Sequence, residues 1–251
     1  MPRYKLEIEY DGTGFVGWQR QENGPSVQQS IEEAVEKFCG TVTNVPSAGR
    51  TDSGVHARAM VAHVDIDGDY QGAKVRDAIN FHLKPRPIAI LSAERVSEEF
   101  HARFSCVRRA YEYRITNRRM PLALDVNRTW RVWPSLDADA MDDAAQVLVG
   151  RHDFTTFRSV KCQSESAVKS LEEISVMRAG EDVFIRCAAR SFLHNQVRSF
   201  AGTLAEVGKG KWTKRDLSDA LNAADRARCG PVAPPEGLYF IRADYAAGNR
   251  S

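Results

Sequence analysis

The 251-residue sequence has few cysteines and no long hydrophobic run, and each absence excludes a class of protein. Its five cysteines are scattered and never spaced C-x-x-C, which argues against a disulfide framework or a zinc site and favours a reducing compartment. No apolar run approaches the roughly 18 residues that span a bilayer. The charged, alternating N-terminus, MPRYKLEIEYDG, does not resemble a signal peptide. We therefore expect a cytoplasmic protein with no membrane partner.

Neither sign of charge predominates, since the 35 basic residues are nearly balanced by 33 acidic ones and the net charge is only +2. The distribution is uneven, however. Residues 101–119 contain six arginines against one acidic residue, and residues 208–215, GKGKWTKR, contain four basic residues and no acidic one. A basic stripe on a nearly neutral protein is the footprint expected for a nucleic-acid backbone, although an ordinary solvated face gives the same pattern.

Hydrophobic periodicity predicts two similar halves. In the first half it predicts strands at 4–10, 41–48, 59–67 and 87–96 and helices at 26–40 and 73–83. In the second half it predicts strands at 109–116, 169–178, 183–190 and 237–245 and helices at 136–150, 192–208 and 213–224. Ser26 and Thr213 are the predicted caps of their helices, and Gln29 is expected to complete a capping box with Ser26.

Each half follows the order β-α-β-β-α-β, which is typical of the ferredoxin-like, or split βαβ, unit. We therefore predict an α+β fold in which two ferredoxin-like halves form a continuous antiparallel sheet, with helices on one face and a central basic cleft. The predicted boundaries place the first half at 1–105, the second half at 106–246 and a tail at 247–251.

Residues 12–17, GTGFVG, match the G-x-G-x-x-G fingerprint of dinucleotide-binding proteins. In that fingerprint the third glycine opens a helix, whereas here the predicted helix begins only at Ser26. A nucleotide-dependent oxidoreductase is therefore the weaker interpretation. We expect no nucleotide cofactor, and instead a flexible loop that lets Phe15 and Trp18 reach a ligand.

Two further catalytic patterns are also weak. Ser53, His56 and Asp52 could supply a hydrolase triad, but the G-x-S-x-G elbow is absent and adjacent loop residues rarely converge in that geometry. The six histidines show no H-E-x-x-H or other ligand spacing, so we expect no metal.

Asp52 stands out within GRTDSGVHAR, residues 49–58. An aspartate in such a turn often does no more than accept a hydrogen bond from its own backbone. Here Gly49 and Gly54 would permit close approach of another molecule, and Arg50 could contact a phosphate. A nucleophilic aspartate is one of the few cofactor-free groups that can act on a glycosidic bond.

The stretch GRTDSGVHA closely resembles the catalytic motif of the tRNA pseudouridine synthase A (TruA) family. The resemblance extends over nearly the whole chain, through YDGTGFVGWQRQ, FHARFSCVRRAYEYRI, FLHNQVRSFAGTLAEVGKGKW and APPEGLYF. It implies two ferredoxin-like halves, no cofactor or metal, and a homodimer that binds tRNA across both subunits. It also implies the isomerisation of uridine to pseudouridine at positions 38–40 of the tRNA anticodon stem-loop.

The resemblance also assigns roles to four residues. Asp52 matches the essential aspartate, which would attack either C1′ of the sugar or C6 of the uracil. Tyr111 matches the tyrosine that stacks on the flipped base and is a candidate general base. Arg198 matches the arginine that pairs with the aspartate, and Arg50 matches the arginine associated with flipping the nucleotide. The two basic segments would then follow the tRNA phosphates.

Three positions depart from the family pattern. Family members commonly have alanine at the position of Ser53, and residues other than Asn195 and Gln196 before the arginine of the later motif. A non-catalytic RNA-binding module is a further alternative, since ferredoxin-like sheets also occur in RRM domains. The sequence lacks the aromatic box that an RRM requires, so we favour the enzyme.

Overall fold

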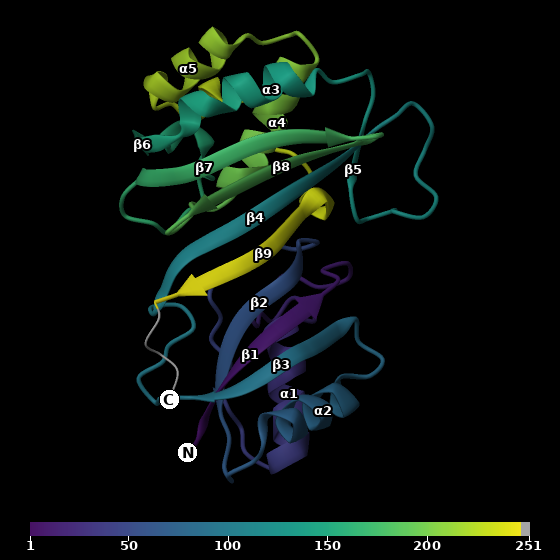
Figure 1. Ribbon diagram of the computed structural model, residues 1–251, viewed down its shortest axis with the longest axis vertical. Coiled ribbons are helices and arrows are strands. Elements are labelled where there is room, and N and C mark those ends of the chain that lie inside the picture. Colours follow the sequence, from purple (N-terminus) through teal and green to yellow (C-terminus); the bar gives the residue numbers. More distant parts are fainter. Residues whose placement is uncertain (247–251) are drawn as a thin grey trace. The chain divides into compact units, whose positions relative to one another are not determined.

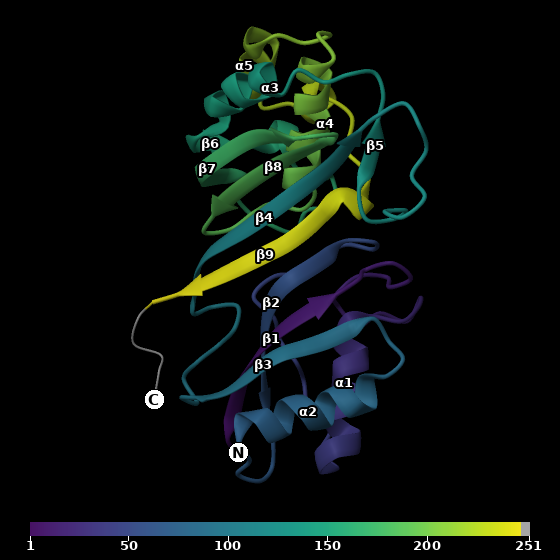
Figure 2. The same cartoon turned by 45° about the vertical axis from the view of Figure 1, so that its right-hand side comes forward.

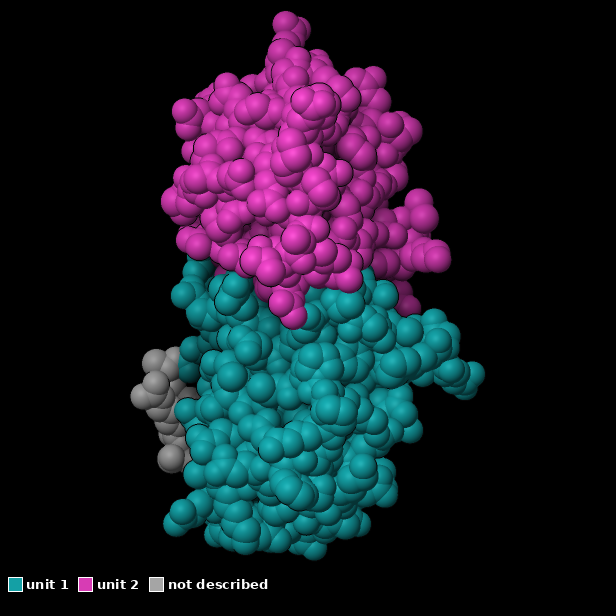
Figure 3. Space-filling view, turned by 90° about the vertical axis from the view of Figure 1, so that its right-hand side faces the viewer, with its two compact units in different colours: residues 1–109, 240–251 teal, residues 110–239 magenta. Residues whose placement is uncertain are grey.

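The computed structural model describes residues 1–246, which form two compact units (Figures 1 and 3). Unit 1 comprises Met1–Arg109 together with the described residues from Phe240 onward, and unit 2 comprises Ala110–Tyr239. Five α-helices and nine strands occur in residues 1–246, and the strands form a large, mostly antiparallel sheet, so the predicted α+β class is confirmed. The predicted tail at 247–251 lies outside the described residues, and the predicted boundary between residues 105 and 106 remains a prediction.

Unit 1 is built around a central strand that pairs on both sides. Its elements are β1 (Arg3–Tyr10), α1 (Val27–Cys39), β2 (His56–Asp65), α2 (Gly72–Leu83), β3 (Ile88–Val96) and most of β9 (Leu238–Tyr245). The strand order is β3-β1-β2-β9, and β1 is antiparallel to both β2 and β3. Alternate residues of β1 are buried, which is the period expected for a strand with one face on the core. The helices α1 and α2 pack on each other, and α2 packs on β3 (Figure 1).

The predicted strand at 41–48 is wrong. This segment makes one isolated bridge, Ser47 to Ala62 of β2, supported by a hydrogen bond of 2.7 Å from the amide of Ala48 to the carbonyl of Val61. Pro46 has no amide hydrogen to contribute to a ladder, which limits the pairing. In the sheet order β2 lies between β1 and β9, and β9 comes from the other end of the chain.

The first turn of α1 is capped as predicted, but by a simpler device than a capping box. The Ser26 hydroxyl accepts a hydrogen bond of 3.2 Å from the amide of Gln29. The side chain of Gln29 does not return to Ser26; it donates to Glu33 on the next turn, at 2.9 Å. Gly40 ends the helix with φ of 72°, the left-handed conformation that glycine adopts at little cost.

Unit 2 repeats the strand and helix order with additions. Its elements are the greater part of β4 (Cys106–Asn117), then β5 (Trp130–Val132), α3 (Ala138–Ala145), β6 (Gly150–Asp153), β7 (Val168–Ala179), β8 (Asp182–Ala189), α4 (Gln196–Gly208) and α5 (Lys214–Ala223). The strand order is β4-β8-β7-β6, and β5 pairs parallel with β4. The predicted hairpin is confirmed as β7 and β8, which lie side by side in both ribbon views (Figures 1 and 2).

Two helices of unit 2 are shorter than predicted. The helix expected at 136–150 ends at Ala145 and continues as a 3-10 turn over Gln146–Leu148. Gly150, expected to end that helix, instead opens β6 with φ of 108°. The helix expected at 192–208 begins at Gln196, because Asn195 adopts a left-handed conformation that no α-helix continues through.

His63 on β2 is a buried titratable group of unit 1. Its side chain is 5% exposed, and its Nδ1 accepts a hydrogen bond of 3.1 Å from the amide of Ala102. Burial, together with the positive charge of Arg3 and the neighbouring His101, lowers the pKa of His63 from 6.5 to about 4, while Asp65 opposes the shift. The imidazole is therefore neutral in the folded protein at neutral pH.

The lowered pKa of His63 predicts a loss of stability in mild acid. Between about pH 6.5 and pH 4 the unfolded chain binds a proton that the folded chain excludes, so the free energy of unfolding falls as pH falls. His63 contributes at most about 1.4 kcal/mol per pH unit to that slope. Urea unfolding at several pH values should show a shallower slope for His63→Gln than for the wild type. Equal slopes would contradict the assignment.

Thr213 allows a test of the capping predictions at an exposed position. Its hydroxyl accepts from the amide of Asp216 at 3.2 Å, and the Asp216 carboxylate accepts from the amide of Thr213 at 2.7 Å, which completes a capping box on α5. Thr213→Ala should lower the free energy of unfolding by about 1 kcal/mol, because it removes the acceptor. Thr213→Ser retains the hydroxyl and should unfold at the wild-type urea concentration.

Candidate active site

Asp52 occupies a tight turn at the start of β2 in unit 1. The amide of Val55 donates to the carbonyl of Asp52 at 3.1 Å, and Gly54 within the turn has φ of 78°. The Ser53 hydroxyl donates to the carbonyl of Phe15 at 3.0 Å, which ties the turn to the GTGFVG loop. A backbone bond and the Ser53 hydroxyl thus hold the turn, and Asp52 is half-buried within it.

The glycines of GTGFVG permit direct contact between two backbones. A Cβ atom on Gly12 would lie 2.1 Å from the carbonyl oxygen of Val55, and one on Gly17 would lie 2.5 Å from that of Thr51. Gly17 also forms an isolated bridge with Asp52, and the amide of Trp18 donates to Thr51 at 3.0 Å. The G-x-G-x-x-G pattern therefore serves to pack this loop against the Asp52 turn.

The expectation that Phe15 and Trp18 of this segment reach a ligand is wrong. Both side chains are buried, with 7% and 2% of their surface exposed. The ring centroids of Trp18 and Tyr10 lie 5.9 Å apart. The backbone carbonyl of Trp18 accepts a hydrogen bond of 2.9 Å from the amide of Gln28. The close backbone packing that the glycines allow leaves the aromatic side chains directed into the core.

His56 has a structural bond and does not form a triad with Ser53 and Asp52. Its Nδ1 accepts a hydrogen bond of 3.0 Å from the amide of Gly12 and lies 3.1 Å from Oδ1 of Asp11. The hydroxyl of Ser53 is directed to a carbonyl instead of this imidazole.

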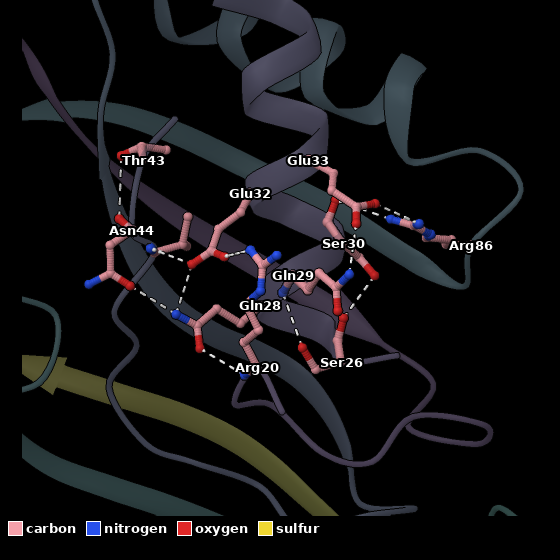
Figure 4. Close-up of polar contacts among 11 residues, drawn as sticks. Arg20, Ser26, Gln28, Gln29, Ser30, Glu32, Glu33, Thr43, Asn44 and Arg86 are labelled. Carbon is pink, nitrogen blue, oxygen red and sulfur yellow. Dashed lines mark hydrogen bonds and ion pairs between the residues drawn. The ribbon is translucent and has the colours of Figure 1, made fainter. Parts of the chain in front are cut away.

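The buried carboxylate of Glu32 on α1 joins two segments (Figure 4). One follows the GTGFVG loop, and the other precedes the Asp52 turn. Oε1 of Glu32 accepts from Nε2 of Gln28 at 2.8 Å and from the amide of Val45 at 3.3 Å, and Oε2 lies 3.2 Å from Nη1 of Arg20. Arg20 follows the GTGFVG loop and Val45 precedes the Asp52 turn. Glu32 thereby fixes one end of each loop on the same helix.

An open groove of about 410 Å³ lies over this network. Its lining residues are Arg20, Gln28, Glu32, Glu33, Glu36, Val42, Thr43 and Asn44. Three carboxylates against one guanidinium give it the wrong charge for an RNA backbone. None of the four predicted site residues lines it, so we assign no site there.

The two predicted site residues of unit 2 lie on β4 and α4. The ring of Tyr111 meets that of Phe192 edge-to-face, with centroids 5.1 Å apart and an interplanar angle of 83°. Nε of Arg198 donates to the carbonyl of Ala233 at 2.8 Å, and Nη1 donates to Oδ1 of Asn195 at 3.0 Å. These bonds determine the direction of the guanidinium.

The departures from the family pattern have structural explanations that sequence alone did not suggest. Asn195 adopts φ of 64°, which asparagine tolerates better than most residues, and its side chain holds Arg198. Gln196 is buried, and its Oε1 accepts from the amide of Leu193 at 2.8 Å. The hydroxyl of Ser53 makes the cross-loop bond to Phe15 that an alanine could not make.

The four predicted site residues divide between the two units. Arg50 and Asp52 share one loop of unit 1, with Arg50 exposed, and Tyr111 and Arg198 belong to unit 2. The convergence of the two pairs at one site, and the central basic cleft, remain predictions. Within residues 1–246, His, Cys, Asp and Glu side chains form no group of three able to hold a metal ion. Of the helices in that same range, none combines the length and apolar character needed to cross a bilayer.

Comparison with known proteins gives matches over most of the chain. The family described as tRNA pseudouridine synthase matches residues 7–105 and 144–246. The tRNA pseudouridine synthase A of Maricaulis maris is 62% identical over 98% of each chain, and that of Parvibaculum lavamentivorans is 60% identical over 98% of this chain and 100% of its own. A solved Cbf5-Nop10-Gar1 complex covers 94% of this chain and 48% of its own, with 10% identity and a TM-score of 0.38, which is too low to carry an argument.

These matches identify the class of protein, which is an isomerase that acts on tRNA. The chain belongs to the tRNA pseudouridine synthase family. The matched segments contain Arg50, Asp52 and Arg198, whereas Tyr111 falls between them.

The contact between the two loops predicts unequal effects of two glycine substitutions. Gly14 and Gly17 both have positive φ, but a Cβ on Gly14 has no atom within 4 Å. Gly14→Ala should lower the free energy of unfolding by about 1 kcal/mol through backbone strain alone. Gly17→Ala should lower it by about 3 kcal/mol or more, and should reduce tritium release from [5-³H]uridine-labelled tRNA, because it displaces the Asp52 turn. Equal effects of the two substitutions would contradict the packing role.

Proposed function

We propose that this chain converts uridine to pseudouridine at positions 38–40 of the tRNA anticodon stem-loop, with Asp52 as the catalytic residue. The observation that carries the proposal is the Asp52 turn, which a backbone bond and glycine contacts hold against the GTGFVG loop. Family membership adds the reaction and its substrate class. A carboxylate on a rigid support is what a nucleophile requires, because little reorganisation is then needed at the moment of attack.

The proposed reaction needs one nucleophile and one base. The Asp52 carboxylate attacks C1′ of the ribose or C6 of the uracil, and the bond between N1 and C1′ breaks. The uracil turns so that C5 joins C1′, the proton on C5 leaves to a base, and Asp52 is released. Atoms balance without a cofactor because substrate and product are isomers. The target base must leave the stack before it can react, since stacking hides C1′ and C6.

The other three residues assist this chemistry in the proposal. Arg198 would place its guanidinium beside Asp52 and keep the carboxylate ionised, and its bonds to Ala233 and Asn195 support a defined orientation. Tyr111 would stack on the flipped base and take the C5 proton, with Phe192 supporting its ring. Arg50, exposed and two residues before Asp52, would hold the nucleotide out of the helix.

The same proposal covers the partners of the chain. We propose a cytoplasmic homodimer that binds tRNA without a nucleotide cofactor or metal. The arginines of residues 101–119 and the lysines of GKGKW would follow the phosphate backbone and supply affinity instead of sequence choice.

Asp52→Asn tests the proposed nucleophile. With [5-³H]uridine-labelled tRNA and no added cofactor, the wild type should release tritium, and the variant should release it about 1,000-fold more slowly or not at all. Binding of tRNA should persist, because the amide has the same shape. Ser53→Ala, in the same turn, should retain most of the activity. Equal release by wild type and Asp52→Asn would refute the catalytic role of Asp52, and no release by the wild type would favour a non-catalytic RNA-binding protein.

A further inference from the structure

The turn at residues 101–105 of unit 1 presents an exposed aromatic ring. Phe104 has 77% of its surface exposed. The turn is closed on itself, because the amide of Ser105 donates to the carbonyl of His101 at 2.9 Å and the amide of His101 donates to the Ser105 hydroxyl at 3.0 Å. Nδ1 of His101 also accepts from the amides of Arg103 and Phe104, at 3.1 and 3.3 Å. The exposed ring therefore sits on an ordered support.

Buried residues of unit 1 anchor this turn. The amide of Ala102 donates to Nδ1 of the buried His63, and the Tyr245 hydroxyl donates to the carbonyl of Ala102 at 2.8 Å. The buried ring of Phe100 packs against both of these partners, with centroids 6.1 Å from His63 and 5.0 Å from Tyr245. Phe104 is thus exposed although the turn that carries it is fixed on both sides.

The neighbours of Phe104 have the chemistry of a base-stacking platform. The imidazole of His101 lies 4.4 Å from the Phe104 ring, tilted by 37°, and the Arg103 guanidinium lies 5.8 Å from the ring centre. Burial and the charges of Arg3 and Arg103 lower the pKa of His101, which favours the neutral ring. An aromatic face beside a cation is the combination with which proteins bind unpaired bases.

Arg109 connects this turn to the loop that carries Asp52. Its Nε donates to the carbonyl of Ala48 at 2.8 Å, and its Nη2 donates to the carbonyl of Arg103 at 2.7 Å. Ala48 lies two residues before Arg50 in the same loop. A single guanidinium therefore sets the position of the aromatic turn relative to the Asp52 loop, inside one unit.

We propose that Phe104, with His101 and Arg103, forms a stacking platform for an unpaired base of the tRNA substrate beside the target uridine. The proposal rests on the proposed function for the identity of the RNA. Flipping a base unstacks its neighbours, and an aromatic ring next to the site would compensate for the stacking that is lost.

Three substitutions of Phe104 and one matched control test the platform. Phe81 on α2 is also exposed, at 69%, and contacts His82 edge-to-face, so Phe81→Ala controls for the loss of an exposed ring. The dissociation constant of an unmodified anticodon stem-loop RNA is measured by fluorescence anisotropy. Phe104→Ala should weaken binding by about 5- to 150-fold. Phe104→Trp should retain affinity, Phe104→Leu should lose most of it, and Phe81→Ala should bind like the wild type.

A series of stem-loops with single abasic nucleotides identifies the stacked base. In the wild type one abasic position should weaken binding, and that position should have little further effect in Phe104→Ala, since both changes remove the same contact. Additive losses at every position would overturn the proposal. So would equal binding by Phe104→Ala and Phe81→Ala.

Size-exclusion chromatography of the same variants tests whether the Phe104 ring instead contacts a second copy of the chain. If Phe104→Ala changes the oligomeric state and loses RNA binding only for that reason, the ring belongs to an interface between two copies of the chain and the proposal is wrong. Tritium release is scored separately. Wild type that binds RNA through Phe104 but releases no tritium would refute the proposed function and leave the stacking platform standing.

Discussion

Direct contact between the backbones of the GTGFVG loop and the Asp52 turn is the constraint on which the rest of the site depends. Gly12 and Gly17 make it possible, because a side chain at either position would overlap a carbonyl oxygen of the turn. The first loop leads from β1 into α1, and the turn leads into β2, so this contact joins the first three elements of unit 1. Glu32 reinforces it from α1, where it binds both flanking segments. Backbone groups close the turn, so Asp52 is carried on an ordered support.

The aromatic residues of these segments of unit 1 are either buried in the core or exposed at the surface. Phe15 and Trp18 are buried, whereas Phe104 stays exposed on an anchored turn. Burying an aromatic side chain stabilises a fold, so an ordered turn that exposes one suggests a ligand with a flat apolar face. Arg109 ties that turn to the Asp52 loop through two carbonyls. Unit 1 thus combines a proposed nucleophile with a proposed stacking surface.

Periodicity identified most elements of both units, because amphipathic strands and helices carry their pattern locally. It failed at residues 41–48, where alternation predicts a strand but the strands beside β2 are β1 and β9. A local pattern cannot reveal which distant strands pair with β2 in the folded sheet. The helix starting at 192 failed for a different reason, since the left-handed Asn195 interrupts it. The G-x-G-x-x-G pattern predicts a flexible loop, but it does not predict that Gly12 and Gly17 allow two backbones to meet.

The sequence by itself determined the α+β class, the helix caps at Ser26 and Thr213, and the family to which the chain belongs, because these depend on local patterns and ordered motifs. It also identified Asp52, Arg50, Tyr111 and Arg198 as candidates by resemblance. Only the tertiary structure decided why the glycines are required, that Asn195 holds Arg198, and that Arg109 joins two loops. Each of these is a contact made in the folded protein. The spacing of residues along the sequence does not specify which atoms will meet in the fold.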